Sequence, residues 1–247
     1  MSYKIEICAN SVQSAINAEQ GGADRVELCD NLWEGGTTPS IATIRLTKKQ
    51  LNIPAFVLIR PRGGDFVYSD MEFEIIKEDL IAAKEAGVNG VVSGVLLPDG
   101  KIDIKRTREL VALSSPLSFT FHRAFDQVPD FISGIEDLIQ CGIQRVLTSG
   151  QKEKAIHGIA NIEKMLALAA DRITILAGGG INKKNVTQLY DIGCREFHFS
   201  AKTLMPGLAE QQAKVRMNGS PDISEDSIQV SDSRKILEVK KILDEKV

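Results

Sequence analysis

A glycine placed between an amphipathic run and a β-rich run recurs four times in this chain. Such a glycine can adopt the left-handed conformation that closes a helix C-terminus, where a side chain would be strained. The four occurrences are Gly22-Ala23-Asp24-Arg25-Val26, Gly87-Val88-Asn89-Gly90-Val91, Gly142-Ile143-Gln144-Arg145-Val146 and Gly193-Cys194-Arg195-Glu196-Phe197. They are separated by 65, 55 and 51 residues, or about two βα units of roughly 25 residues each. Four double units predict eight strands and hence a (β/α)8 barrel, whose chemistry lies at the C-terminal ends of its strands.

The length and charge of the chain agree with one such barrel. A (β/α)8 barrel takes roughly 250 residues; this chain has 247, and no linker-like run divides its middle, so we expect a single domain over residues 1–247. The net charge of −3, with both signs interspersed, argues against a nucleic-acid or membrane-surface partner. The opening Met1-Ser2-Tyr3-Lys4 leads into a strand without a signal-peptide or membrane-spanning run. We therefore expect a cytoplasmic protein.

The hydrophobic pattern gives the approximate positions of eight strands and eight helices. The strands are expected near 4–8, 24–29, 54–60, 89–94, 117–122, 144–149, 172–177 and 195–200. The helices are expected near 11–20, 40–50, 72–86, 104–113, 130–141, 153–170, 183–191 and 233–246. Two connections are long, residues 61–71 and 202–232, and both would emerge on the catalytic face. The second is predicted to be a long polar loop before the last helix, either a solvated linker or a segment that orders on binding.

The alternation of residues along the strands places polar side chains inside the barrel. Alternate residues of a strand face the same way, and the apolar set of several strands must face the helices. The polar set left for the interior or the barrel mouth comprises Glu6, Cys8, Glu27, Cys29, Arg60, Thr120, His122, His198 and Ser200. Buried charges must pair with one another or with a ligand. Two interpretations stay open: an internal ion-pair network, for instance Glu6 or Glu27 with Arg60, or a functional site.

Several motifs, in order along the chain, resemble the CutC family. They are Glu6-Ile7-Cys8-Ala9-Asn10-Ser11, Val26-Glu27-Leu28-Cys29-Asp30-Asn31, Gly35-Gly36-Thr37-Thr38-Pro39-Ser40, Ile59-Arg60-Pro61-Arg62-Gly63-Gly64-Asp65-Phe66, Thr120-Phe121-His122-Arg123-Ala124-Phe125-Asp126 and Ile175-Leu176-Ala177-Gly178-Gly179-Gly180. The resemblance extends from the first strand to about Ser200. It implies a cytosolic (β/α)8 barrel linked to copper homeostasis. It also implies that Cys8 and Cys29 match the cysteines proposed as Cu(I) ligands in that family.

Copper binding by these two cysteines is chemically reasonable. Thiolates are soft ligands that favour Cu(I), and the two residues end adjacent strands whose axes lie about 4.8 Å apart. His122 or His198 is a candidate third ligand. The alternative is that Cys8 and Cys29 are ordinary core residues, since buried cysteine is common. Cys141 and Cys194 are expected to be packing residues at helix ends, and all four cysteines are expected to be thiols.

An enzyme acting on a small anionic or phosphorylated metabolite is the competing hypothesis. Gly179 and Gly180 follow the seventh strand and Ser200 follows the eighth, where many barrels bind phosphate with backbone N–H groups and a helix N-terminus, here near Asn182. The glycines can equally make only a tight turn. Further candidates are Arg60, Arg62, Arg123 and His198 as ligand-binding residues, Glu6, Glu27 and His122 as general acid or base, and Asp126 as a group that orients His122 or Arg123. The sequence selects no reaction, and it allows a homo-oligomer without marking its interface.

Overall fold

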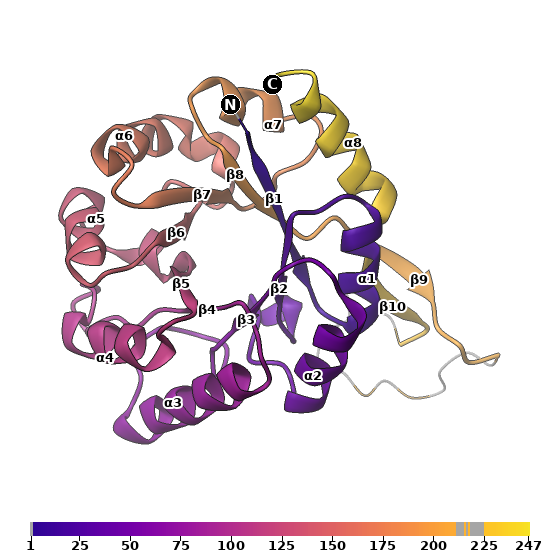
Figure 1. Cartoon of the computed structure of the whole chain (residues 1–247), viewed down its shortest axis with the longest axis horizontal. Coiled ribbons are helices and arrows are strands. Elements are labelled where there is room, and N and C mark those ends of the chain that lie inside the picture. Colours follow the sequence, from indigo (N-terminus) through magenta and orange to yellow (C-terminus); the bar gives the residue numbers. More distant parts are fainter. Residues whose placement is uncertain (1, 211–214, 216, 218–224) are drawn as a thin grey trace.

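Eight parallel strands close into a barrel in chain order, as the sequence predicts (Figure 1). The structure is a computed structural model that describes residues 2–210, 215, 217 and 225–247. The strands are β1 (Lys4–Ala9), β2 (Arg25–Leu28), β3 (Ala55–Leu58), β4 (Gly90–Ser93), β5 (Ser118–Phe121), β6 (Arg145–Thr148), β7 (Thr174–Gly178) and β8 (Glu196–Phe199). β1 pairs with both β2 and β8, and this pairing closes the sheet without an open edge.

The helices surround the barrel and are close to their expected positions. They are α1 (Val12–Gln20), α2 (Ile41–Gln50), α3 (Asp70–Glu85), α4 (Ile104–Ser114), α5 (Phe131–Gln140), α6 (Ile159–Ala169), α7 (Val186–Asp191) and α8 (Ser233–Asp244), with short 3-10 turns η1 (Leu32–Glu34), η2 (Arg123–Gln127) and η3 (Ala155–Gly158). The sequence locates α3 well because Ser69 and Glu72 form a capping box at its start, and its apolar positions at helical spacing are all buried. α7 is shorter than expected, since the chain from Lys183 to Asn185 forms a turn before it.

The barrel strands send their apolar set outward and their polar set inward. Ile5, Ile7, Val26, Phe119 and Phe197 are buried between the sheet and the surrounding helices. A separate apolar cluster of Cys8, Cys29, Phe56, Leu58 and Val92 lies in the interior. A shift of one residue in register would exchange these two sets, so the burial of the outer face determines which polar side chains share the interior.

A layer of buried charges fills the barrel interior near the N-terminal ends of the strands. We call it the charged layer; it contains Glu6, Arg25, Arg145 and Glu196. Glu6 forms an ion pair with Arg25 through Oε2 and Nε. Glu196 Oε2 lies 2.8 Å from Nη2 of Arg25 and 2.8 Å from Nε of Arg145. The Phe56 ring packs against both guanidinium groups, with centroid distances of 4.8 and 5.4 Å. The expected pairing of Glu6 or Glu27 with Arg60 was therefore wrong for Glu6, because Arg25 on the neighbouring strand is closer and lies in the same layer.

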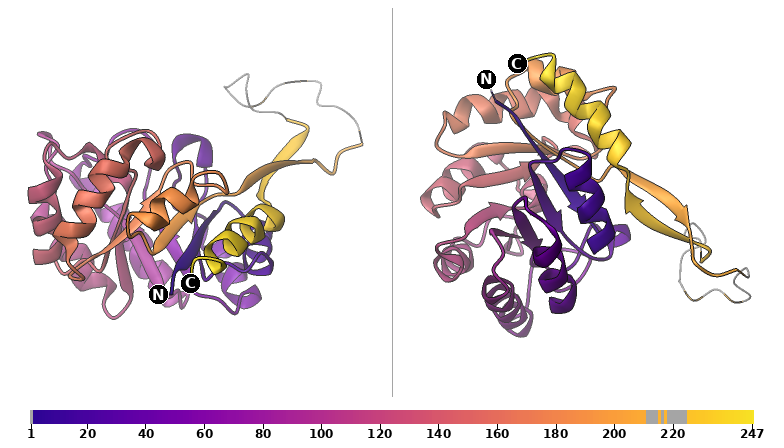
Figure 2. Two further views of the ribbon diagram at one scale, coloured as in Figure 1. Left: turned by 90° about the horizontal axis from the view of Figure 1, so that it is seen from above. Right: turned by 45° about the vertical axis from the view of Figure 1, so that its right-hand side comes forward.

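The segment predicted as a long loop over residues 202–232 contains an antiparallel β-hairpin. β9 (Lys202–Pro206) pairs with β10 (Ser227–Ser231), and the two strands extend away from the barrel (Figures 1 and 2). Most of their residues are at least partly exposed, so no buried apolar face marks them in the sequence. Residues 211–214, 216 and 218–224 of the predicted loop lie outside the described residues. α8 follows the hairpin and packs beside α1 and α7.

Candidate functional site

Three potential metal ligands converge above the charged layer, one from each of β1, β2 and β8. A sulfur of Cys8, a carboxylate oxygen of Glu27 and an imidazole nitrogen of His198 all lie within 4.8 Å of one another. The strand register explains this convergence, because Cys8 pairs with Glu27 across β1 and β2, while Glu6, one inward position below Cys8, pairs with His198. Short-range alternation on each strand and closure of the barrel together produce the cluster.

Glu6 orients the His198 ring within this cluster. Nδ1 of His198 lies 2.8 Å from Oε1 of Glu6, and Nε2 lies 3.7 Å from Oε2 of Glu27. A carboxylate hydrogen-bonded to one ring nitrogen is the usual support of a metal-ligating histidine, since it holds the ring and leaves the other nitrogen for the ion. The structure thus directs Nε2 of His198 toward Glu27.

Cys29 completes a pair of sulfurs at the same place. Its Sγ is 3.2 Å from Sγ of Cys8, and one thiol donates to the other. Cys29 is buried within the apolar interior cluster, whereas Cys8, also part of that cluster, borders a cavity. All four cysteines are free thiols within the described chain. Cys141 caps α5 and Cys194 precedes β8, and both are buried among core residues as the sequence predicts.

Burial and neighbouring charges set the protonation of the cluster. Burial alone would raise the pKa of Glu6, but the Arg25 charge and the His198 hydrogen bond lower it to about 2. Burial opposes the charged form of His198, but Glu27, Cys8 and Glu6 raise its pKa well above the ordinary value. The hydrogen bond with Cys29 and burial raise the pKa of the Cys8 thiol well above its usual range. Burial also raises the pKa of Glu27. The cluster therefore favours the protonated forms of His198 and Cys8 in the free protein.

His122, expected as a general acid or base, does not join this cluster of Cys8, Glu27 and His198. Its Nδ1 accepts a hydrogen bond from the Ala124 backbone N–H at 3.2 Å, so the proton of the neutral ring lies on Nε2. Burial and the Arg60 charge lower the pKa of His122 to about 3. A ring with one nitrogen occupied and the other protonated neither accepts a proton nor ligates a metal at neutral pH.

The three candidate arginines have different surroundings. Arg60 donates to the backbone carbonyls of Glu34, Gly36 and Gly64, each at 2.8 Å, and so holds two loops together. Arg62 lies outside the barrel mouth, where it pairs with Glu72 and Asp65. Arg62 was expected to bind a ligand, but it lines neither the cavity at the barrel mouth nor the groove beside α8.

Arg123 and Asp126 form an ion pair at the mouth. Arg123 Nε lies 2.7 Å from Oδ2 of Asp126. Asp126 also accepts hydrogen bonds from Thr148 and Ser149, so it orients Arg123 and the β6 loop. The sequence left open whether Asp126 orients His122, orients Arg123 or caps a short turn; in the structure Asp126 contacts Arg123.

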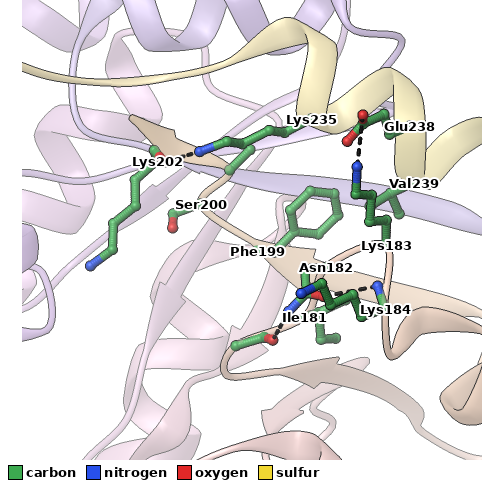
Figure 3. A pocket seen from close by; sticks show the side chains of 12 residues that line it. Ile181, Asn182, Lys183, Lys184, Phe199, Ser200, Lys202, Lys235, Glu238 and Val239 are labelled. Carbon is green, nitrogen blue, oxygen red and sulfur yellow. Dashed lines mark hydrogen bonds and ion pairs between the residues drawn. The ribbon is translucent and has the colours of Figure 1, made fainter. Parts of the chain in front are cut away.

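Two separate hollows contain the remaining candidates. A cavity of about 300 Å³ occupies the barrel mouth and is lined by Cys8, Glu27, Arg60, His122, Arg123 and His198, together with Glu34, Gly35, Leu58, Phe66, Asp126, Gln127 and Leu147. A groove of about 500 Å³ lies between the β7 and β8 loops and α8 (Figure 3). Gly180 and Ser200 line this groove, whereas a side chain at Gly179 would lie 3.6 Å from Nη1 of Arg123, toward the mouth. The expected ligand set is thus divided between two places.

Lysines give the groove its positive charge. Lys183, Lys184, Lys202 and Lys235 line it, with Glu238 as the acidic residue of its lining (Figure 3). The expected backbone cradle near Asn182 is not free, because the Asn182 N–H donates to the Asn185 side chain and the Lys184 N–H donates to the Asn182 side chain.

The sequence interpretation missed three buried charges: Arg25, Arg145 and Glu196. Continuing the alternation two residues toward the start of the strand would have found Arg25 from Glu27 and Glu196 from His198. The same alternation applied to β6 would have found Arg145. It also did not single out Lys183, Lys184 and Lys235, which lie in ordinary polar segments and become neighbours only when α8 packs against the β7 loop.

A family model described as the CutC family matches residues 3–203. The chain belongs to the CutC family. The match ends within β9, so it covers the barrel and the residues of the mouth.

Other CutC proteins agree with this assignment. The human copper homeostasis protein cutC homolog is 45% identical over 236 residues, covering 95% of this chain and 86% of the human protein. A family protein CutC from Chromobacterium violaceum is 45% identical over 203 residues, covering 82% of each chain. The name of the human relative associates the family with copper homeostasis.

Solved structures agree on the barrel. A crystal structure of CutC from Streptococcus agalactiae superposes with a TM-score of 0.77 at 34% identity, covering 80% of this chain and 98% of that one. Thiamine phosphate pyrophosphorylase from Pyrococcus furiosus has a TM-score of 0.58 at 15% identity, covering 98% of this chain and 96% of that one, a likeness that concerns the fold alone. Among the described residues, no helix has the length and apolar character needed to cross a membrane.

Proposed function

We propose that this CutC protein binds Cu(I) through the thiolates of Cys8 and Cys29, with Nε2 of His198 as third ligand. The observation that supports it most is the combination of two adjacent sulfurs with a histidine whose other nitrogen is hydrogen-bonded to Glu6. Two soft thiolates and one imidazole suit Cu(I) better than a hard cation such as Mg²⁺. Glu27, beside the same atoms, offsets positive charge when the ion enters.

The sulfurs must separate slightly to hold one ion. With metal–thiolate bonds of about 2.3 Å, two sulfurs of a trigonal site are about 4.0 Å apart. The observed 3.2 Å separation is that of two thiols sharing a hydrogen bond. Cys8 borders the mouth cavity, so rotation of its side chain provides the extra distance without moving the buried Cys29.

The cellular setting follows from the same chemistry. Free thiols persist in a reducing compartment, and Cu(I) is the copper state that thiolates favour. We infer a cytoplasmic protein that takes part in copper homeostasis by holding Cu(I) at the barrel mouth.

An anaerobic Cu(I) titration against a chelating competitor tests the site. The wild type is expected to bind one tight equivalent, and the Cys8→Ser/Cys29→Ser variant is expected to lose it because both soft ligands are gone. The matched control is Cys141→Ala/Cys194→Ala, which removes two buried thiols outside the mouth and should retain the equivalent. Equal stoichiometry in the wild type and the Cys8/Cys29 variant would exclude the thiolate site.

A second candidate function, binding of a small phosphorylated metabolite, is favoured by the lysine-lined groove. Lys183 is neutralised by Glu238 at 3.0 Å, and Lys235 donates to the Lys202 carbonyl at 2.8 Å. Lys184 and Lys202 add to the positive charge of the groove lining. The Nζ of Lys202 lies 5.6 Å from the centroid of the Trp33 ring. Lysine ammonium groups bind phosphate as point charges.

Inorganic phosphate is the first probe for this groove. We expect phosphate to raise the melting temperature of the wild type, because a ligand that binds only the folded state stabilises it. Lys202→Ala/Lys235→Ala should abolish the increase, while Lys48→Ala/Lys101→Ala, two surface lysines elsewhere, should not. An identical shift in both double variants would contradict the groove as an anion site.

A further inference from the structure

His122 presents a hydrogen-bond donor that the protein itself does not use. The ring is 5% exposed, and its Nε2 has no hydrogen-bond partner in the part of the chain that the structure describes. Because Nδ1 accepts from the Ala124 N–H, Nε2 must be the protonated nitrogen. Burying a donor without a partner is unfavourable, so such a group in a cavity wall indicates a missing acceptor.

The surroundings hold the His122 ring in place. A side chain at Gly94 would meet the imidazole at 2.8 Å, so only glycine leaves room for the ring. The Phe66 ring covers it from the β3–α3 loop, with centroids 4.9 Å apart, and the same ring packs 4.9 Å from the Arg60 guanidinium. Phe66 is half-buried and lines the mouth cavity. Its ring therefore separates His122 from solvent and must move to admit a ligand.

Arg123 supplies a second donor to the same cavity. Its Nε and Nη2 bind Asp126, Ser149 and the Lys152 carbonyl, which hold the guanidinium in one orientation. No hydrogen bond of Nη1 is found within the described residues, and this nitrogen lies 3.6 Å from the position that a Cβ at Gly179 would take. A guanidinium held in this way is suited to a carboxylate, whereas a neutral imidazole N–H is suited to a carbonyl oxygen or to an oxyanion.

We propose that the barrel mouth binds a small oxo acid, with its carboxylate on Nη1 of Arg123, its carbonyl oxygen on Nε2 of His122 and Phe66 as the movable cover. The cavity of about 300 Å³ accommodates a molecule of a few heavy atoms. This site goes beyond Cu(I) binding, because it uses neither cysteine and because His122, with its Nδ1 occupied, is not a metal ligand.

Calorimetric titration with pyruvate tests the site, with acetate as the probe that lacks the carbonyl group. Pyruvate is expected to bind one site per chain and more tightly than acetate. His122→Asn keeps an acceptor for the Ala124 N–H but removes the distant donor, so it should weaken pyruvate binding at least about tenfold and leave acetate binding unchanged. Arg123→Leu should weaken both. The charge-matched control Arg172→Ala, at an exposed pair with Glu136, should change neither.

Histidine NMR on the unmutated protein keeps the proposal testable if His122→Asn fails to fold. The chain has three histidines, so ¹⁵N-histidine labelling yields three imidazoles. We expect the His122 ring to remain the neutral Nε2–H tautomer and its Hε2 signal to move downfield as pyruvate is added. Inorganic phosphate bound in the lysine groove should leave that signal in place. Absence of pyruvate binding, equal affinity for pyruvate and acetate, or an unmoved Hε2 signal would each overturn the proposal.

The Cu(I) titration of His122→Asn separates this inference from the proposed copper function. Cu(I) affinity should be unchanged in that variant, because its ring contributes no ligand to the metal. A loss of Cu(I) together with pyruvate would show that the two sites are one and would overturn the proposal of a separate oxo-acid site.

Discussion

Glu196→Gln is expected to lower the free energy of unfolding by about 3–5 kcal/mol, because it leaves two buried cations with one carboxylate. Glu196 lies between Arg25 and Arg145 in the barrel interior, at 2.8 Å from each. Removing its charge leaves Arg25 paired with Glu6, whereas Arg145 has no other ion pair among the described residues. The amide keeps the shape of the side chain, so the loss reflects charge rather than a cavity. Urea unfolding at pH 7 measures it.

Glu136→Gln is the matched control for this change. Glu136 pairs with Arg172 at 2.6 Å, but both side chains are more than 40% exposed, and an exposed pair contributes about 0–1 kcal/mol. Arg145→Met introduced into Glu196→Gln should recover part of the lost stability, because it removes the cation left unpaired. Equal destabilisation by Glu196→Gln and Glu136→Gln would show that the interior charges are not energetically coupled.

Cu(I) affinity is expected to rise with pH between pH 6 and 8, by about tenfold per pH unit for each proton that binding releases. A metal needs a thiolate and a neutral imidazole, yet in the free protein the pKa values of Cys8 and His198 are both raised well above their ordinary values. Both groups therefore hold protons in this range, and binding must release them. Each released proton strengthens binding about tenfold per pH unit, so affinity increases as pH rises and falls as pH drops.

Competition titrations at pH 6, 7 and 8, corrected for protonation of the chelator, measure this slope. His198→Gln removes one of the ligands that must lose a proton and should reduce the slope by up to about one logarithmic unit per pH unit. Lys48→Ala, at an exposed position, should leave the slope unchanged. A pH-independent affinity would mean that the ion does not displace protons from Cys8 and His198, and it would contradict the proposed ligand set.

Local patterns were sufficient to predict the barrel. The recurring glycines end four of the eight βα units, and each predicted strand and helix is present. The largest shift is at α6, which was expected near 153–170 but begins at Ile159, after the 3-10 turn η3. The hairpin β9–β10 was missed because its strands pair with each other and remain largely exposed, so no apolar face reveals them. The start of α7 was misplaced because the side chains of Asn182 and Asn185 form a turn that competes with the helix.

The site was predictable as a set of residues but not as a set of contacts. Alternation on the strands identified Glu6, Cys8, Glu27 and His198 as neighbours at one end of the barrel. The partner of Glu6 was not identified, since the alternation was followed to Arg60 after β3 but not to Arg25 on β2, the strand that pairs with β1. Distances decided between them, and these depend on how the strands are staggered around the closed sheet.

The sequence by itself determined the repeat, the strand alternation and thus which side chains enter the barrel, because a period of two residues is a local property of the chain. The tertiary structure decided which of these side chains touch. It placed two sulfurs 3.2 Å apart and made Glu6 the support of His198. Hydrogen-bond partners and protonation depend on distances of a few ångströms between residues far apart in the chain, and only the closed barrel sets those distances.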